Sequence, residues 1–165
     1  MSSDAIVILR NDHKEMRKLF RAFDKADDDA RKAELVRQII GELTAHTYIE
    51  NECMYPETRA LLPDLEDDIL ESYEEHHVAD VLCAELFAMD ATDERFEAKT
   101  KVLIEIVEHH MEEEEQEWFP EVREGLGRKK LVEIGDRMLA MKETAPRSPE
   151  DPKARKSAAD AAGAA

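Results

Sequence analysis

The sequence contains few aromatic residues, few glycines and no long hydrophobic run. Aromatic residues make up 5% of the 165 residues and glycines number 5, whereas Leu, Ala, Glu, Lys and Met are common. This composition favours helix over sheet and predicts an all-α protein. The apolar run from Ile6 to Leu9 is too short for a signal peptide, and no stretch approaches the roughly 20 residues that span a bilayer. We expect a cytoplasmic protein without a membrane partner.

Cysteines are also scarce, and basic residues are outnumbered by acidic ones. The 23 Lys and Arg are outnumbered by 40 Asp and Glu, which gives a formal net charge of -17. Nucleic acid and anionic membranes would repel such a chain, so neither is expected as a partner. Cys53 and Cys83 are the only cysteines and form no CxxC pair, which argues against a zinc ribbon or a redox motif. We expect both to be reduced and buried.

Apolar residues recur at spacings of three and four through four segments, each bounded by residues that favour turns. They predict an antiparallel up-down four-helix bundle whose helices begin near Asp4, Asp27, Pro63 and Thr92. A shorter fifth helix is expected at about 129–142. From residue 144 onward, prolines lie among Ala, Ser, Lys and Asp, a composition that buries too little apolar surface to become ordered. We predict one domain over 1–143, with its long helices over about 4–126, and a disordered tail over 144–165.

The second half of the chain repeats the first. Residues 46–56 align without a gap with residues 110–120: each segment has a His, a Glu four residues later, and an aromatic residue followed by Pro at its end. His13 aligns in the same way with His76, so the offsets between the halves are 63 and 64 residues. Two similar helical hairpins are therefore joined head to tail.

The positions of the turns place the repeated polar residues at one level of the bundle. Antiparallel neighbours bring two residues to the same level when the midpoint between them falls at the connecting turn. Three midpoints fall at residues 29–30, 63 and 93, beside the predicted turns; the pairs are His13 with His46, Glu50 with His76, and His76 with His110. Four helices would then bring six side chains to one layer of the core: His13, His46, Glu50, His76, His110 and Glu114.

These six side chains have the chemistry of a metal site. Residues four apart on a helix differ by about 40° around its axis, so His46 points with Glu50, and His110 with Glu114. Imidazole and carboxylate groups suit iron, manganese or zinc. Six ligands are too many for one tetrahedral metal, and two carboxylates can bridge two cations, so we expect a dinuclear centre.

A purely structural role is the alternative for these residues. A lone His on an apolar helix face is more often a hydrogen-bonded core residue, and a single HxxxE is commonly a surface pair. Burying six ionisable groups in one layer without a metal is costly, which favours the metal site. His77 and His109 lie about 100° away from the proposed ligands and should face a neighbouring helix or solvent. Glu115 stays open as a substitute for Glu114, and Tyr55 as a hydrogen-bond donor or an electron donor.

The pattern H, HxxxE, H, HxxxE over four successive helices resembles the hemerythrin-like family with the HHE cation-binding domain. The matching residues, in order over about 4–126, are His13, His46 to Glu50, His76 and His110 to Glu114. The resemblance implies a non-haem di-iron centre with an oxo or hydroxo bridge. Glu50 and Glu114 would bridge the metals and the four His would be terminal ligands, with manganese or zinc as alternative metals.

One departure from the pattern concerns function. The oxygen-carrying hemerythrins are similar but have a second His four residues after the first on the third helix, where this chain has Asp80 after His76. Their fourth helix also has an Asp five residues after its His, whereas the pair here is His110 and Glu114. These differences argue against dioxygen transport.

The resemblance leaves several functions open. We expect a di-iron protein, a monomer or weak homodimer, that binds or reacts with dioxygen, hydrogen peroxide or nitric oxide. An enzyme version would decompose peroxide in the manner of a catalase or peroxidase. A version without turnover would be an iron, oxygen or redox sensor or an iron-storage module. A plain helical interaction module would leave the six polar residues structural.

Overall fold

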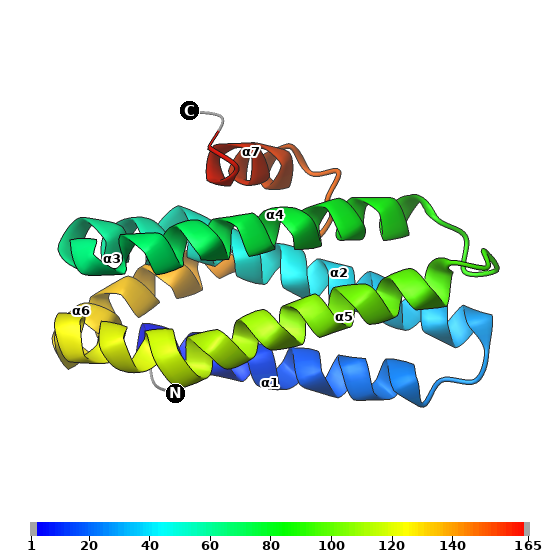
Figure 1. The fold of residues 1–165 in the computed structure, drawn as a ribbon, viewed down its shortest axis with the longest axis horizontal. Helices are drawn as coiled ribbons and strands as arrows, with labels where there is room; N and C mark the ends of the chain where they lie inside the picture. The colour runs from blue at the N-terminus through cyan, green and yellow to red at the C-terminus, as the bar shows by residue number, and fades with distance from the viewer. Residues whose placement is uncertain (1–2, 164–165) are drawn as a thin grey trace.

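The computed structural model describes residues 3–163 and shows a bundle of antiparallel helices (Figure 1). Four of its long helices form the bundle that the sequence predicts: α1 (Ala5–Asp24), α2 (Asp29–Ile49), α4 (Glu66–Ala88) and α5 (Phe96–Glu113). No strand occurs within the described range, so the all-α bundle predicted from the sequence is confirmed. None of the described helices is long and apolar enough to cross a membrane.

Aspartate side chains begin the first two helices as N-caps. Asp4 accepts hydrogen bonds from the backbone N–H groups of Ile6 at 3.0 Å and Val7 at 3.3 Å, and Asp28 accepts one from Arg31 at 2.9 Å. Such caps satisfy N–H groups that have no partner within the helix. Both helices therefore begin within two residues of the starts predicted from the sequence.

The end of the bundle away from the α1–α2 turn contains the shorter elements (Figure 1). α2 continues through a π-helical turn, η1 (Glu50–Met54), into α3 (Tyr55–Leu61), and a 3-10 turn, η2 (Pro63–Leu65), leads into α4. α5 continues in the same way through a second π-helical turn, η3 (Glu114–Trp118), into α6 (Phe119–Lys142). The two halves of the sequence repeat therefore share an unusual backbone feature.

The π-helical turns change which side chains face the core. In a regular α-helix, residues five apart lie about 140° apart around the axis. In η1 the N–H of Tyr55 donates to the C=O of Glu50, and this wider turn brings both side chains into the interior, where both are fully buried. In η3 the N–H of Phe119 donates to the C=O of Glu114 with the same effect. Each repeat thus presents a carboxylate and an aromatic ring to the core.

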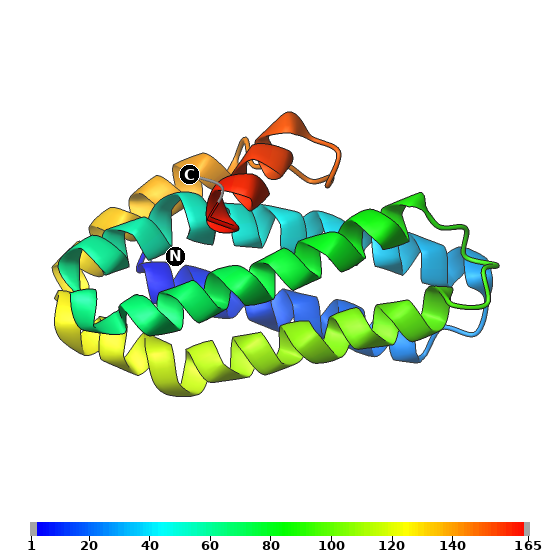
Figure 2. The same cartoon turned by 45° about the horizontal axis from the view of Figure 1, so that its top comes forward.

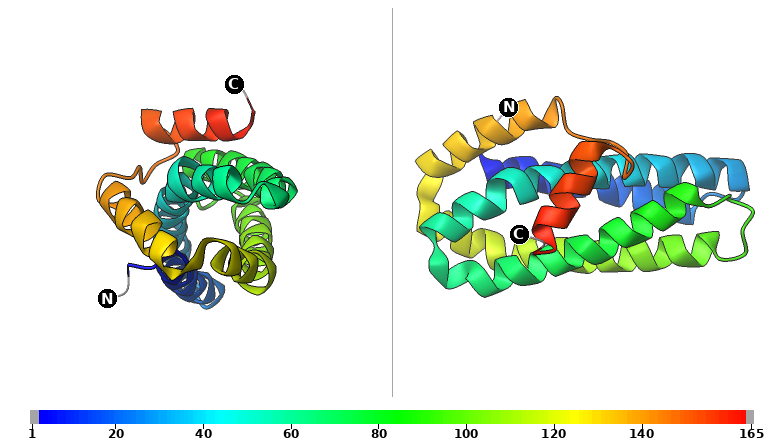
Figure 3. Two further views of the ribbon diagram at one scale, coloured as in Figure 1. Left: turned by 90° about the vertical axis from the view of Figure 1, so that its left-hand side faces the viewer. Right: turned by 90° about the horizontal axis from the view of Figure 1, so that it is seen from above.

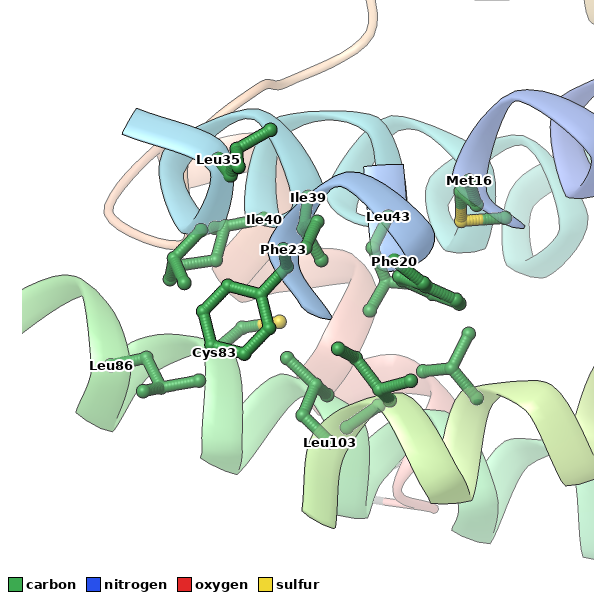
Figure 4. Packing of buried hydrophobic residues seen from close by; sticks show 14 of the residues in the cluster. Met16, Phe20, Phe23, Leu35, Ile39, Ile40, Leu43, Cys83, Leu86 and Leu103 are labelled. Carbon is green, nitrogen blue, oxygen red and sulfur yellow. The ribbon is translucent and has the colours of Figure 1, made fainter. Parts of the chain in front are cut away.

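Two apolar clusters fill the bundle on either side of a polar layer. One cluster, shown in Figure 4, includes Met16 and Phe20; the other includes Leu9 and Ile49. Fully burying a side chain of this size contributes about 1.5–3 kcal/mol, so the clusters supply most of the favourable energy. Along α1 the order Leu9, His13, Met16 shows how the polar layer lies between them. Cys53 and Cys83 are free and buried within the clusters, as expected.

The predicted fifth helix forms the second part of α6. Gly127 interrupts α6 with φ 70° and ψ 167°, a conformation that is almost restricted to glycine. Beyond this kink, Leu131, Ile134 and Met138 are buried in the second cluster. A Cβ at Gly135 would lie 1.7 Å from the backbone O of Ser3, so glycine at this position permits α6 to lie directly against the start of α1.

The C-terminal segment differs from the predicted disordered tail over 144–165. Up to residue 163 it is described, and it contains a helix, α7 (Pro152–Ala161), that crosses the outside of the bundle over α4 and α2 (Figures 2 and 3). Asp151 caps this helix by accepting a hydrogen bond from the N–H of Lys153 at 2.8 Å, and Pro152 occupies its first turn. The segment is too polar for a core of its own, but small residues such as Ser157 pack against a bundle that is already folded.

Candidate metal centre

The structure brings all six sequence-predicted residues into one buried layer. They are contributed by the four long helices and the two π-helical turns: His13, His46, Glu50, His76, His110 and Glu114. Their donor atoms form two groups, and within each group the atoms lie within 4.8 Å of one another. The first group consists of His13, His46, Glu50 and Glu114. The second consists of Glu50, His76 and His110, so the two groups share the carboxylate of Glu50. Two adjoining His/Glu groups with a shared carboxylate are suited to a pair of metal ions.

Glu50 lies between the two halves of the repeat. Its Oε2 atom is 3.2 Å from Nε2 of His46, on its own helical segment, and 3.4 Å from Nε2 of His76, in the other half. One carboxylate oxygen is thus within reach of an imidazole from each group. Glu50 is therefore the carboxylate that the two donor groups share.

Glu114 occupies the equivalent position in the other half. Its Oε2 atom is 3.3 Å from Nε2 of His13, and its Oε1 atom is 3.7 Å from Nε2 of His110. The two oxygens of this carboxylate therefore face histidines of different groups. The two halves of the sequence repeat therefore also place their glutamates in similar positions relative to the histidines.

Outer polar groups hold each imidazole so that its Nε2 atom points inward. All four Nδ1 atoms face an oxygen atom: Glu115 Oε1 at 2.8 Å for His13, Asp12 Oδ2 at 3.5 Å for His46, Asn51 Oδ1 at 2.8 Å for His76, and Glu75 Oε2 at 2.5 Å for His110. Such partners select the tautomer with a free Nε2 and orient the ring toward a metal. Glu115 is therefore an outer partner of His13, also bound to Arg17 at 2.8 Å, whereas Glu114 points inward.

Several inward-facing atoms of the layer are buried without a hydrogen-bond partner in the described structure: Nε2 of His13 and of His46, both carboxylate oxygens of Glu50, and Oε2 of Glu114. A buried polar atom without a partner costs about 1–3 kcal/mol. Divalent cations would satisfy these atoms together, since each is a lone-pair donor in a set that transition metals prefer. The residues present therefore fit a metal pair.

Residues 4–122 match the hemerythrin HHE cation binding domain. The chain belongs to this family. The domain is also similar to a DNA nickase from Nostoc sp. (strain PCC 7120), with 29% identity over 119 residues, which are 72% of this chain and 33% of the relative. The chain thus spans about a third of the length of that relative. A comparison with solved structures finds no match.

Charges within the layer of this HHE domain are strongly coupled. Burial alone would lower the pKa values of His13 and His110, but hydrogen bonds and nearby carboxylate charges raise both to about 9. Burial would raise the pKa of Glu114, yet these histidines hold it well below its usual range. Burial and the charge of Glu114 raise the pKa of Glu50 to about 7, and burial lowers that of His76 to about 3. A metal ion entering the layer must therefore displace protons.

Tyr55 belongs to the centre of this HHE domain. Its hydroxyl donates to Oε1 of Glu114 at 2.9 Å and lies 3.3 Å and 3.4 Å from Nε2 of His76 and His110. Burial raises the pKa of the phenol well above 10.0, so the hydroxyl keeps its proton. The equivalent residue of the other half, Phe119, stacks on His13 with ring centroids 5.8 Å apart. The two sides of the centre are therefore chemically different.

The neighbouring candidates lie outside the buried layer. His77 and His109 are exposed, which agrees with the register that selects His76 and His110. Asp80, one turn beyond His76, belongs to neither donor group of the layer. Burial raises the pKa of Asp80 to about 7. Asp80 therefore contributes no donor atom to either group of the layer.

Proposed function

We propose that this HHE domain is a non-haem di-iron protein that binds or reacts with small oxidants such as dioxygen, hydrogen peroxide or nitric oxide. The supporting observation is that Glu50 and Glu114 each face one histidine from each half, while buried donor atoms around them lack partners. When bound at such a site, a pair of iron ions supplies redox-active Lewis acids. Manganese or zinc would fit the same donor set.

One of the spaces beside the centre supports a small ligand. A cavity of about 10 Å³ is lined by His46, His76 and His110 together with Thr47, Glu75 and apolar side chains. That volume is about what one water-sized molecule requires. It suits a diatomic molecule or a peroxide and is too small for an organic substrate.

The protein's own residues fix the polar groups of the layer. Tyr55 keeps its proton on the hydroxyl oxygen and directs it at Glu114, and the carboxylates behind the rings hold protons at Nδ1 of His13 and His110. Because these groups are largely buried, with side-chain exposures of 8% for His110 and 2% for Glu114, competition from bulk water is weak.

Metal analysis combined with an absorption spectrum tests the proposal. Iron-loaded protein is expected to hold two iron ions per chain and to show the charge-transfer bands of a bridged ferric pair. His76→Ala should reduce the content of tightly bound iron, whereas His77→Ala, which alters the exposed neighbour, should retain it. No more than one firmly bound metal per chain after anaerobic loading would contradict the proposal.

Turnover can be tested separately from binding. A peroxide-decomposing enzyme would evolve dioxygen from hydrogen peroxide catalytically, and Glu50→Ala or His110→Ala would abolish the reaction. His77→Ala is the matched control, because this exposed residue is adjacent in sequence to a proposed ligand but lies outside the layer. Stoichiometric bleaching of the iron spectrum without turnover would contradict the enzyme version.

A sensor or storage module without turnover is the second candidate. One contact favours signalling: Asp12, which faces Nδ1 of His46 at 3.5 Å, also forms an ion pair with Lys142 at the end of α6. A change at the layer could therefore alter α6 and the segment that follows. Limited proteolysis should differ between reduced and oxidised protein over residues 129–147. Identical cleavage patterns would remove the support for this version.

The activity named for the Nostoc relative is not part of the proposal. The match covers only 33% of that protein, so its activity can reside in the part that this chain does not match. The formal net charge of -17 also opposes approach to DNA phosphates.

A further inference from the structure

An acidic channel opens beside the centre, between α4 and the α5–η3–α6 segment. It has a volume of about 140 Å³, and seven of its ten lining residues are Asp or Glu, while no Lys or Arg is among those that line it in the described structure. The volume has room for several water molecules or for a hydrated ion. His110 and Glu114 lie in its inner wall, so the channel reaches two of the proposed ligands.

His109 does not line the channel, but its donor atom lies within 4.8 Å of donor atoms of two lining residues, Glu75 and Glu113. From His109 inward, side-chain exposure falls. Side-chain exposure is 66% for His109 and 45% for Glu113 at the surface, 20% for Glu75, 8% for His110 and 2% for Glu114. Each of these residues offers an imidazole nitrogen or a carboxylate oxygen. A cation can therefore move inward from one donor to the next as its hydration shell is removed.

The outermost donors form a compact group at the mouth. Donor atoms of Glu75, His109 and Glu113 lie within 4.8 Å of one another, and Nε2 of His109 is 3.3 Å from Oε1 of Glu113. Two carboxylates and one imidazole are ligand types also found in the buried layer. Glu75 links the two places, because its other contact is with Nδ1 of His110 at 2.5 Å.

A buried atom at the inner end lacks a partner, which points to a polar occupant of the channel. Nε1 of Trp118 is buried without a hydrogen-bond partner in the described part of the chain, and Trp118 lines the channel. The indole N–H matches the oxygen of a water molecule. A water molecule carried by a partly hydrated cation would satisfy it, beside the carboxylate of Glu114, which also lines the channel.

We propose that the acidic channel is the uptake route for divalent cations, with Glu75, His109 and Glu113 as a first, weak binding site at its mouth. This inference rests on the proposed metal centre. It gives His109, which is not a ligand of that centre, a role in binding the incoming cation. A cleft with one sign of charge concentrates ions of the opposite sign and can raise association rates by about 10- to 1000-fold.

Stopped-flow loading of the full chain tests the route. Metal is first removed with a chelator, and Co²⁺ alone is the probe, because its binding quenches the fluorescence of Trp118, the single tryptophan. The mouth variant combines His109→Ala with Glu113→Gln. The control combines His77→Ala with Glu94→Gln, which makes the same chemical changes at exposed positions outside the channel.

The mouth variant is expected to load at least about fivefold more slowly than wild type and control, with two equivalents bound at equilibrium in all three. About 0.5 M NaCl should slow the wild type toward the variant, because salt screens the attraction. A mouth variant that loads at the control rate with normal stoichiometry would overturn the uptake route alone. Wild-type protein that binds fewer than two equivalents would contradict the proposed centre itself.

Discussion

Replacing Tyr55 by Phe removes the hydroxyl that donates to Oε1 of Glu114 at 2.9 Å. Both residues are buried, so bulk solvent does not surround the carboxylate, and a replacement donor would have to be a water molecule in the acidic channel that Glu114 lines. A hydrogen bond to a charged acceptor contributes about 1.5–3 kcal/mol. In a domain of this length 1 kcal/mol corresponds to about 2–4 °C, so the Tm of metal-free protein should fall by about 3–12 °C. The ring itself should fit, because the equivalent residue of the other half is Phe119.

Thermal unfolding followed by circular dichroism, with chelator present, measures this effect. Tyr73→Phe is the control, because it makes the same change in a ring that packs edge-on against Tyr55, with centroids 5.3 Å apart. We expect the control to alter the free energy of unfolding by less than about 0.5 kcal/mol. Equal Tm values for the two variants would refute the assignment of Tyr55 as a stabilising donor to the layer.

Three further predictions concern the outer partners, pH and the α6 kink. Glu115→Gln should weaken metal affinity by about 10- to 100-fold in chelator competition, because the carboxylate orients His13; unchanged affinity would contradict that role. In metal-free protein the pKa values of His13 and His110 rise from 6.5 to about 9, so their stabilisation is complete below about pH 6.5 and is lost as pH rises through about 9. Urea midpoints should therefore fall from pH 7 to 9.5, and a rise would contradict the assignment. Gly127→Ala should lower the free energy of unfolding, measured in urea, by about 1–3 kcal/mol, because alanine is strained at a φ of 70°. No atom within 4 Å would clash with the added Cβ, so an unchanged free energy would show that the backbone at the kink is not strained.

The sequence was sufficient to predict which residues meet in the layer. The positions of residues such as His13 and His46 could be predicted because helix periodicity, the internal repeat and the turn positions all depend on spacing along the chain. The same spacing separated His76 from His77 and His110 from its neighbour, and the exposure of the neighbours agrees. In an antiparallel bundle, the spacing of residues along the chain therefore predicts which way a side chain faces and at which level of the bundle it lies.

Features that depend on contacts between helices could not be predicted from the sequence. The pairing of Asn51 with His76, and of Glu75 with His110, depends on how the π-helical turns and α4 are rotated. The residues of α7 are polar, so the helix depends on its contacts with the bundle surface that it covers, and these contacts are not visible in the sequence. The role of Tyr55 required the five-residue turn of η1, which a regular helical projection would have placed on a different face.

The two π-helical turns occupy equivalent positions in the two hairpins. Such turns are rare and are frequently found at functional sites. Here both begin at the glutamate of HxxxE and end just before the aromatic–proline pair. The repeat in the sequence is therefore also a repeat of backbone geometry, and the two halves differ beside the layer in one chemical group, the hydroxyl of Tyr55, which Phe119 lacks.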